Sequence, residues 1–408
     1  TLWHTLSLHD ALPILLRDMT DTGGGFYSAE DADSEGEEGL FYLWTPEEIE
    51  NTLGKEKAGL INDLLNIRRG GNFTDQASGQ KTGRSIPHLS SSAEEFARRH
   101  HLSPQEMKIK WQNARKTLFE TRRKRVHPEK DDKILTDWNG LMIAALAKAA
   151  AALDEPQYRH AAEHAADFIW EKLRDKNGQL LKRYRHGESG QPAHLDDYAF
   201  MVWGLLQLYE LTFETKHLKR ALILNEKMLQ LFADTRHGGF FFSSPEQKDL
   251  LVRQKELYDG AIPSGNSVAA MNLLRLARLT GNPELEQHAQ RIGRAFSMQI
   301  SRIPMGHTHY LSSLMFALGP SFEVVIAGSA EAEDTQGMLR ALQQRFLPNT
   351  VFLLRPTDSP EPEITRLAEF TAEQNSIEGL ATAYVCQNHV CQAPIRDVKE
   401  MVEMLGNG

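Results

Sequence analysis

Three segments of this chain are apolar on nearly every side of a helix, and this feature constrains the fold more than any other. A helix without a polar face has to be covered by other elements, so each is expected to lie inside the molecule. An amphipathic segment with one charged face follows each of them, which is typical of a helix at the surface. The apolar segments are 139–153, 198–212 and 267–281, and the amphipathic ones are 156–173, 217–234 and 282–300.

The alternation of inner and outer helices repeats about every 60 residues, and such self-similarity is typical of repeat architectures. Helical hairpins in series can close into a ring. The sequence therefore predicts a mainly α fold, an α/α toroid.

The connections between the predicted helices repeat as well. A turn marked by glycine and aromatic residues follows the outer helices, as in Gly24–Tyr27 ("GGFY") and Gly238–Phe242 ("GGFFF"), and Asn177-Gly178 stands at the equivalent place. Glycine supplies positive φ and aromatic residues suit strands, so each turn is predicted to be a small β-hairpin. Acidic and amide residues precede each inner helix, in the stretches 131–140, 194–198 and 259–267.

Polar residues at a helix start are in the first place N-caps, and a capped rim without chemistry is the simplest interpretation. Three such stretches in register would nevertheless converge on one end of the ring. The acidic loop 30–38 follows the first glycine turn and is predicted to form another wall of the same polar funnel.

Carboxylates and histidines at such a funnel could act as acid and base on a sugar, and aromatic rings could lie against its faces. The candidate catalytic residues are Asp31, Asp33, Asp137, Asp196, Asp197 and Asp259. The candidate ligand-binding residues are Trp138, Asn139, His194, Tyr198, Tyr258, Ser264 and Asn266.

The pattern changes after about residue 320, which predicts a small α/β segment over 321–408 that caps or completes the ring. The stretches 322–328 and 350–356 are strand-like and flank a helical stretch at 334–347, which together form a βαβ unit. A hairpin over 381–394 and a final helix follow.

Two cysteines in a chain of this length imply no disulfide framework and suit a reducing compartment. If Asn388-His389 forms a two-residue turn, Cys386 lies directly opposite Cys391 in the hairpin. The pair is therefore a redox candidate, although its spacing is not the C-x-x-C of thiol oxidoreductases. The ordinary interpretation is two buried small side chains.

Charge and composition argue against several other classes of protein. The net charge of −9 disfavours a nucleic-acid-binding surface, and no apolar run reaches the ~18 residues of a membrane span.

The acidic loop has part of a calcium-binding motif. The spacing Asp31-x-Asp33-x-Glu35-Gly36 matches the first half of an EF-hand loop, but Tyr42 stands where a bidentate glutamate is needed. We therefore predict a cytoplasmic protein with no metal, no cofactor and no nucleic-acid or membrane partner.

Several long motifs resemble the spermatogenesis-associated protein 20 family, whose members contain a thioredoxin domain. They are "GGFYSAEDADSEGEEG", "FYLWTPEEI", "DDKILTDWNGLMIAALAKA", "HLDDYAF", "GGFFF", "YDGAIPSGNSVA" and "AYVCQNHVCQAP". The resemblance implies a thioredoxin-like domain followed by an (α/α)6 toroid of the six-hairpin glycosidase type, similar to N-acylglucosamine 2-epimerase and several glycoside hydrolases. It implies a toroid over 15–320 that the α/β segment 321–408 completes or caps.

The start of the chain departs from this pattern. Residues 5–14, "TLSLHDALPI", read as a translated sequencing adapter, and the chain lacks an initiator methionine. Residues 1–14 are therefore set aside, and the chain is interpreted as a fragment whose toroid is truncated at its N-terminus. The thioredoxin-like domain and the first hairpins are expected upstream.

Three functions are compatible with these patterns. The first is a glycosidase-like or epimerase-like enzyme of carbohydrate metabolism that acts on a sugar-like small molecule at the funnel. The second is a non-catalytic binding scaffold for the thioredoxin-like domain. The third is a thiol-redox partner of that domain, working through Cys386 and Cys391.

Overall fold

The computed structural model describes residues 8–75, 78–246 and 251–406, which divide into two compact units. Unit 1 consists of Tyr27–Asp132 and the chain up to Leu15, and unit 2 consists of Leu16–Phe26 and Lys133–Gly408. Of the adapter-like stretch, residues 1–7 lie outside the described residues, and the remainder begins helix α1 (Leu8–Asp18). None of the described helices combines the length and hydropathy that crossing a bilayer requires.

Unit 1 has a helical core of its own. Its buried side chains include Trp44, Ile49, Ile61, Phe96 and Met107. The helices that contribute to it are α2 (Pro46–Leu53), α3 (Lys55–Leu64), α4 (Ala93–Arg99) and α5 (Pro104–Arg122).

The acidic loop 30–38 lies in unit 1 and is a short hairpin that follows β1 (Tyr27–Glu30). Strands β2 (Asp33–Ser34) and β3 (Glu37–Glu38) pair across a turn in which Glu35 and Gly36 both have positive φ. Two central residues with positive φ suit the twist of a two-residue hairpin.

Unit 2 contains three helical hairpins of the predicted kind, so the mainly α toroidal fold class is confirmed. The inner helices α6, α8 and α10 pack side by side, α12 continues the row beyond α10, and each outer helix packs on its own inner helix. The helices are α6 (Thr136–Leu153), α7 (Pro156–Lys172), α8 (Leu195–Thr212), α9 (Thr215–Phe232), α10 (Gly265–Thr280), α11 (Pro283–Arg302) and α12 (Thr308–Leu318), with a 3-10 turn at Pro304–Gly306.

Two glycines let the first two inner helices approach backbone to backbone. A Cβ added at Gly140 of α6 would lie 2.5 Å from the carbonyl carbon of Phe200 in α8. One added at Gly204 of α8 would lie 2.8 Å from the carbonyl oxygen of Gly140. The side-by-side packing of α6 and α8 therefore depends on the absence of side chains at both positions.

Each glycine-marked turn is organised by an aspartate. The side chains of Asp21, Asp175 and Asp234 accept backbone N–H groups two residues further along, at 2.7, 2.9 and 2.9 Å. Single β-bridges close the three turns, at Thr20–Phe26, Arg174–Leu180 and Ala233–Phe240. The three glycine turns are therefore closed by single bridges and not by the paired strands of the predicted hairpins. A separate hairpin follows the second turn, in which β5 (Leu181–Arg185) and β6 (Glu188–Pro192) pair across His186-Gly187, with β4 (Lys130–Leu135) beside β5.

The C-terminal segment has the predicted βαβ unit and hairpin. Strands β7 and β8 are parallel, and β9 lies antiparallel to β7, giving the order β10-β9-β7-β8. Its elements are β7 (Phe322–Gly328), α13 (Glu333–Gln343), β8 (Thr350–Pro356), α14 (Ile364–Leu367), a 3-10 turn at Glu369–Thr371, β9 (Thr382–Gln387), β10 (Val390–Cys391) and α15 (Val398–Met404).

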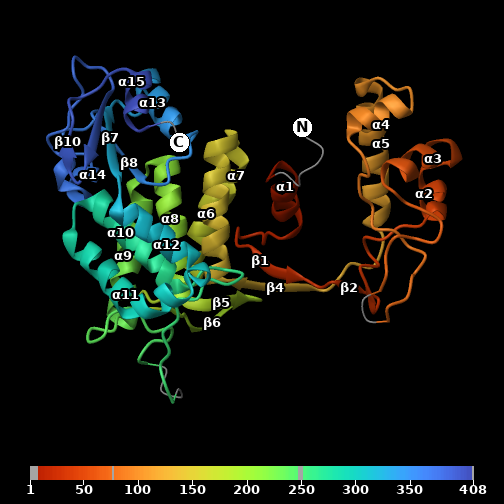
Figure 1. Cartoon of the computed structure of the whole chain (residues 1–408), viewed down its shortest axis with the longest axis horizontal. Helices are drawn as coiled ribbons and strands as arrows, with labels where there is room; N and C mark the ends of the chain where they lie inside the picture. Colours follow the sequence, from red (N-terminus) through yellow and green to blue (C-terminus); the bar gives the residue numbers. More distant parts are fainter. Residues whose placement is uncertain (1–7, 76–77, 247–250, 407–408) are drawn as a thin grey trace. The chain divides into compact units, whose positions relative to one another are not determined.

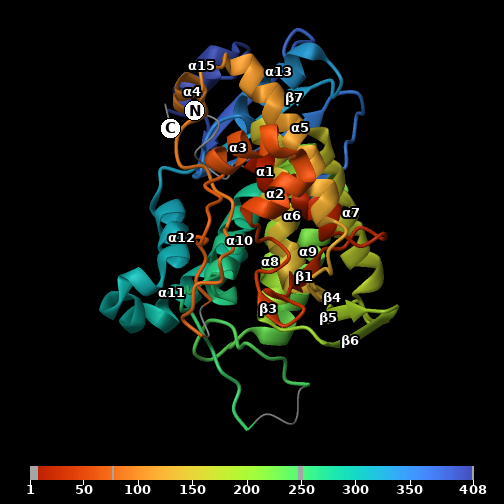
Figure 2. The ribbon, with the colours of Figure 1, turned by 90° about the vertical axis from the view of Figure 1, so that its right-hand side faces the viewer.

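This segment lies at the C-terminal ends of the inner helices, whereas the β5–β6 hairpin lies at their N-terminal ends (Figures 1 and 2). Gln343 ties it to the ring by donating hydrogen bonds of 2.9 Å to the carbonyl oxygens of Glu210 and Leu211. Residues 321–408 thus fall in the same unit as the ring helices. The domain limits of 15–320 and 321–408 remain a prediction.

Replacing Gly140 by alanine is expected to destabilise unit 2 by about 2 kcal/mol or more, because the new methyl group meets backbone atoms that cannot rotate away. Gly337→Ala in α13 is the matched control, since nothing lies within 4 Å of a Cβ there and alanine favours a helix. Chemical denaturation would measure both variants. Equal stability of Gly140→Ala and Gly337→Ala would contradict the close approach of α6 and α8.

Candidate functional site

A lysine and two aspartates form an ion-pair cluster where α6 and α8 begin. Nζ of Lys182, on β5, lies 2.6 Å from Oδ2 of Asp137 and 3.2 Å from Oδ1 of Asp197. The β5–β6 hairpin reaches the N-terminal ends of the inner helices (Figure 1), which brings the lysine to both first turns. Without Lys182, two carboxylates would lie together in a largely buried place.

Asp197 joins the two helices directly. Its Oδ1 accepts the backbone N–H of Asp137 at 3.0 Å, and its Oδ2 accepts the N–H of His194 at 2.7 Å as the carboxylate of a capping box. The side chain is fully buried. Burial raises the pKa of Asp197 to about 7 although the charge of Lys182 opposes the shift.

Asp196 faces a cavity instead of the lysine cluster. It accepts the backbone N–H of Gly265 at the start of α10, where an added Cβ would lie 2.2 Å from Oδ1 of Asp196. The cavity has a volume of about 350 Å³, and Glu256, Tyr258 and Ser264 also line it. Burial, and next the charge of Asp137, raises the pKa of Asp196 to about 6.

Aromatic side chains lie at this end of the ring. Tyr258 at the cavity is 61% exposed, and Trp138 in the first turn of α6 is 45% exposed. The ring of His194 stacks on Phe242, another lining residue, with centroids 4.6 Å apart. Burial, and next the charge of Lys182, lowers the pKa of His194, which keeps the imidazole neutral near pH 7.

Three of the predicted ligand-binding residues hold the glycine turns. The side-chain amide of Asn139 accepts the N–H of Phe26 at 2.8 Å and donates to its carbonyl oxygen at 3.0 Å. Asn266 makes the same pair of bonds to Phe240, at 2.8 and 2.9 Å. The phenol oxygen of Tyr198 accepts the N–H of Leu180 at 2.8 Å. The side-chain polar groups of these three residues therefore already form hydrogen bonds with the backbone of the turns.

Asp259 and Ser264 shape the loop before α10. Asp259 accepts the backbone N–H groups of Ser264 at 3.0 Å and His309 at 2.8 Å, which fixes the loop to the first turn of α12. Ser264 caps α10 by accepting the N–H of Ser267.

The structure therefore gathers His194, Asp137, Asp196 and Asp197 where α6 and α8 begin, and places the loop of Asp259 along the cavity of Asp196. Asp31 and Asp33 belong to unit 1, so their part in the same site remains a prediction.

Sequence reasoning missed two charged residues of this region, Lys182 and Glu256. The signal for Lys182 was the basic stretch "LLKRYR" after the second glycine turn, at a strand position that faces two acidic helix starts. Glu256 precedes Asp259 by three residues and carried no signal of its own.

One group of described side chains has the composition of a metal site. Ligand atoms of Glu163, Glu214 and His217 lie within 4.8 Å of one another. Arg159 already forms ion pairs with both carboxylates, and Lys216 forms another with Glu214. These cations balance the cluster, and we assign no metal to it.

The C-terminal hairpin has the predicted register, with Cys386 opposite Cys391 and Gln387 opposite Val390. The two sulfurs form a disulfide, so the ordinary interpretation of two buried, unbonded side chains is wrong. Cys386 is buried, whereas Cys391 is exposed near the tip of the hairpin.

Sequence comparison relates nearly the whole chain to curated proteins. Spermatogenesis-associated protein 20 of Homo sapiens and that of Rattus norvegicus are each 32% identical to it over 97% of this chain and 53% of their own length. The predicted resemblance to this family is confirmed. An uncharacterized protein of Caenorhabditis elegans is 30% identical over 95% of this chain and 56% of its own length. The chain thus spans about half the length of the curated relatives it matches, and no family model matches it.

Solved structures give weaker likenesses. The cellobiose 2-epimerase of Spirochaeta thermophila aligns with 42% of this chain and 44% of its own, at a TM-score of 0.35 and 17% identity. A family 76 α-mannanase of Bacteroides thetaiotaomicron aligns with 65% of this chain and 69% of its own, at a TM-score of 0.38 and 15% identity. The toroidal assignment above rests on the packing of the helices and not on these scores.

The stability of Asp196→Asn is expected to exceed that of the unchanged protein above pH 6. The raised pKa means that the folded state keeps its proton while the unfolded chain loses it, so stability falls as the pH rises from about 4 to about 6. Asparagine removes this penalty, worth up to about 3 kcal/mol for a shift of about two pKa units, and can still accept the Gly265 N–H.

Denaturation at several pH values would measure the difference, with Asp154→Asn at an exposed helix end as the control. A stability difference between Asp196→Asn and the unchanged protein that stays constant from pH 4 to pH 8 would contradict the raised pKa.

Proposed function

We propose that the cavity beside Asp196 binds a carbohydrate-like ligand and that Asp196 exchanges a proton with it, in a glycosidase-like or epimerase-like reaction. The observation that carries this proposal is a carboxyl group with its pKa raised to about 6 that faces a cavity. A group that titrates close to neutral pH can both give and take a proton, which general acid-base catalysis requires.

Asp196 suits this role better than its neighbours, because their oxygens are already committed. The carboxylate of Asp137 accepts hydrogen bonds from Lys182 and from the backbone N–H of Trp138. Both carboxylate oxygens of Asp197 accept hydrogen bonds from other groups of the protein. In the proposal these two aspartates and Lys182 position the first turns of α6 and α8. The charge of Asp137 also helps to keep the proton on Asp196.

The cavity supplies a second carboxylate and an apolar surface. Glu256 lines it together with Asp196, and glycoside hydrolysis uses such a pair, one as acid and one as base or nucleophile. The exposed ring of Tyr258 offers a flat face to a sugar. A volume of about 350 Å³ lies within the range of ~300–1,000 Å³ typical of small-molecule sites.

The proposal is tested by ligand-observed NMR with free hexoses and by turnover of nitrophenyl glycosides, on this chain and on a longer protein that includes the thioredoxin-like domain. Asp196→Asn should keep sugar binding and lose turnover by about 100-fold or more, because only the proton transfer is removed. Asp154→Asn should change neither.

Turnover that survives Asp196→Asn would remove Asp196 as the acid or base. Binding without turnover in the unchanged protein would favour the non-catalytic scaffold, and absence of binding at millimolar sugar would overturn the proposal.

A second candidate function rests on the disulfide between Cys386 and Cys391. In this proposal a thiolate of the thioredoxin-like domain attacks the exposed Sγ of Cys391, the S–S bond breaks, and Cys386 leaves as a thiolate. A second thiol of that domain then attacks the mixed disulfide and releases Cys391. Two electrons thereby pass to this pair, and the thioredoxin-like domain is oxidised.

Thiol titration of the denatured protein should give two thiols after reduction and none after oxidation, since the chain has two cysteines. Cys386→Ser leaves the exposed Cys391 free, and its thiolate should attack the disulfide form of the thioredoxin-like domain, release one thiolate of that domain and trap a mixed disulfide. Cys391→Ser leaves only the buried Cys386 and should trap little. A thiol count that does not change between the two conditions would rule out the redox function.

A further inference from the structure

A second cavity of unit 2 lies farther along the inner helices, toward the C-terminal segment. It has a volume of about 480 Å³ and shares no lining residue with the cavity beside Asp196. Helices α6, α8, α10 and α12 all contribute side chains to it, and residues 342–348 at the end of α13 border it from the other side. The proposed sugar site makes no use of this cavity.

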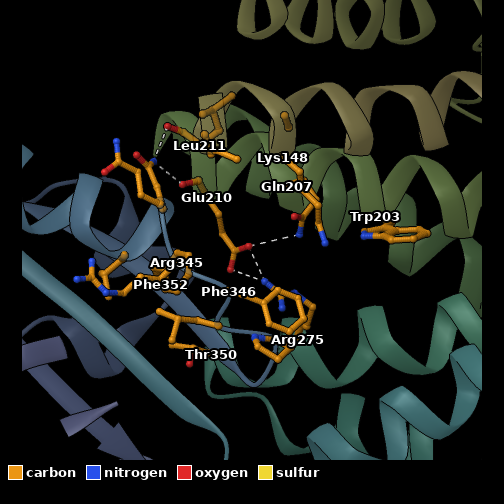
Figure 3. Close-up of a pocket in the computed structure, with 18 of the residues that line it drawn as sticks. Lys148, Trp203, Gln207, Glu210, Leu211, Arg275, Arg345, Phe346, Thr350 and Phe352 are labelled. Carbon is orange, nitrogen blue, oxygen red and sulfur yellow. Dashed lines mark hydrogen bonds and ion pairs between the residues drawn. The ribbon is translucent and has the colours of Figure 1, made fainter. Parts of the chain in front are cut away.

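A buried ion pair stands at its centre. Nη2 of Arg275 lies 2.5 Å from each carboxylate oxygen of Glu210, and Nε2 of Gln207 lies 3.4 Å from Oε2 (Figure 3). Arg275 is 9% exposed, and its Nε has no hydrogen-bond partner. A buried donor without a partner costs free energy, so this guanidinium has unused capacity for another acceptor.

Two further polar groups line the cavity, the exposed side chain of Lys148 and the half-buried imidazole of His309. Lys148 of α6 forms no ion pair within the part of the chain that the structure describes. Nε2 of His309 is buried and has no hydrogen-bond partner. The ring centroids of His309 and Trp203 lie 5.1 Å apart. Desolvation by the surrounding protein lowers the pKa values of both Lys148 and His309, with the charge of Arg275 as the next cause for the lysine.

The charge of this cavity is opposite to that of the whole chain. Lys148, Arg275 and Arg345 line it together with one carboxylate, that of Glu210, in a protein whose net charge is −9. Trp203 adds a flat apolar surface at one end, as Figure 3 shows, and Met271 also lies along the wall. An excess of cations beside an aromatic ring is complementary to an anion with a ring-sized body.

We propose that this cavity binds a small organic acid, with its carboxylate held by Lys148 and Arg275 and its ring against Trp203. Nε2 of His309 then meets a polar substituent of the ligand. Glu210 keeps Arg275 in place without satisfying all of its donors, so the guanidinium is positioned before the ligand arrives.

The test uses the 408-residue chain and two probes of the same shape, benzoate and its neutral analogue benzamide, in isothermal titration calorimetry. Benzoate should bind and benzamide should bind at least tenfold more weakly. Lys148→Gln should weaken benzoate about tenfold, whereas Lys148→Arg should restore most of the affinity. Lys172→Gln, an exposed lysine on the outer helix α7, is the matched control.

Equal binding of the two probes, or benzoate affinity unchanged in Lys148→Gln, would overturn the proposal, as would absence of benzoate binding at millimolar concentration. Trp203→Phe should preserve a smaller aromatic surface and weaken benzoate less than Trp203→Ala. Asp196→Asn should leave benzoate binding unchanged, so failure here is distinguishable from failure of the sugar site.

Discussion

The carboxylate of Asp197 is the contact on which the polar end of the ring depends. It caps α8 through the His194 N–H and accepts the Asp137 N–H from α6, so one side chain satisfies backbone donors of two helices. Helix N-termini carry unsatisfied N–H groups and a partial positive charge, which makes a buried carboxylate tolerable there. Lys182 supplies the remaining compensation. With this cluster in place, the carboxyl group of Asp196 is left to face the neighbouring cavity.

Close packing makes that contact possible. Gly140 and Gly204 remove the side chains that would hold α6 and α8 apart, and Gly265 does the same for the approach of Asp196 to α10. Helices that meet backbone to backbone bring their first turns within reach of one side chain. The contacts of the aspartates therefore depend on the glycines of the inner helices, although the two kinds of residue lie in different turns.

Much of the fold could be predicted from the sequence because its determinants are local and periodic. Apolar and amphipathic periodicity located the six helices of the hairpins, and the strand-like apolar stretches 322–328 and 350–356 located two C-terminal strands. The site was harder, because Lys182 and Glu256 reach it from segments without periodic signal. The ion pair of Glu210 and Arg275 was missed because the two charges lie in different helices, each among largely apolar neighbours. Such a charge has a partner only when two helices are placed side by side.

The repeats themselves separate structural from functional residues. Asn139, Tyr198 and Asn266 do the same work in three successive hairpins, each holding the backbone of a glycine turn. A role that recurs in every hairpin serves the architecture, since a single binding site would need it only once. Asp196 and Lys182 are not among these three side chains that hold the glycine turns. Polar residues that break the repeat are therefore better candidates for chemistry than those that follow it, even though the repeat is what first draws attention to both.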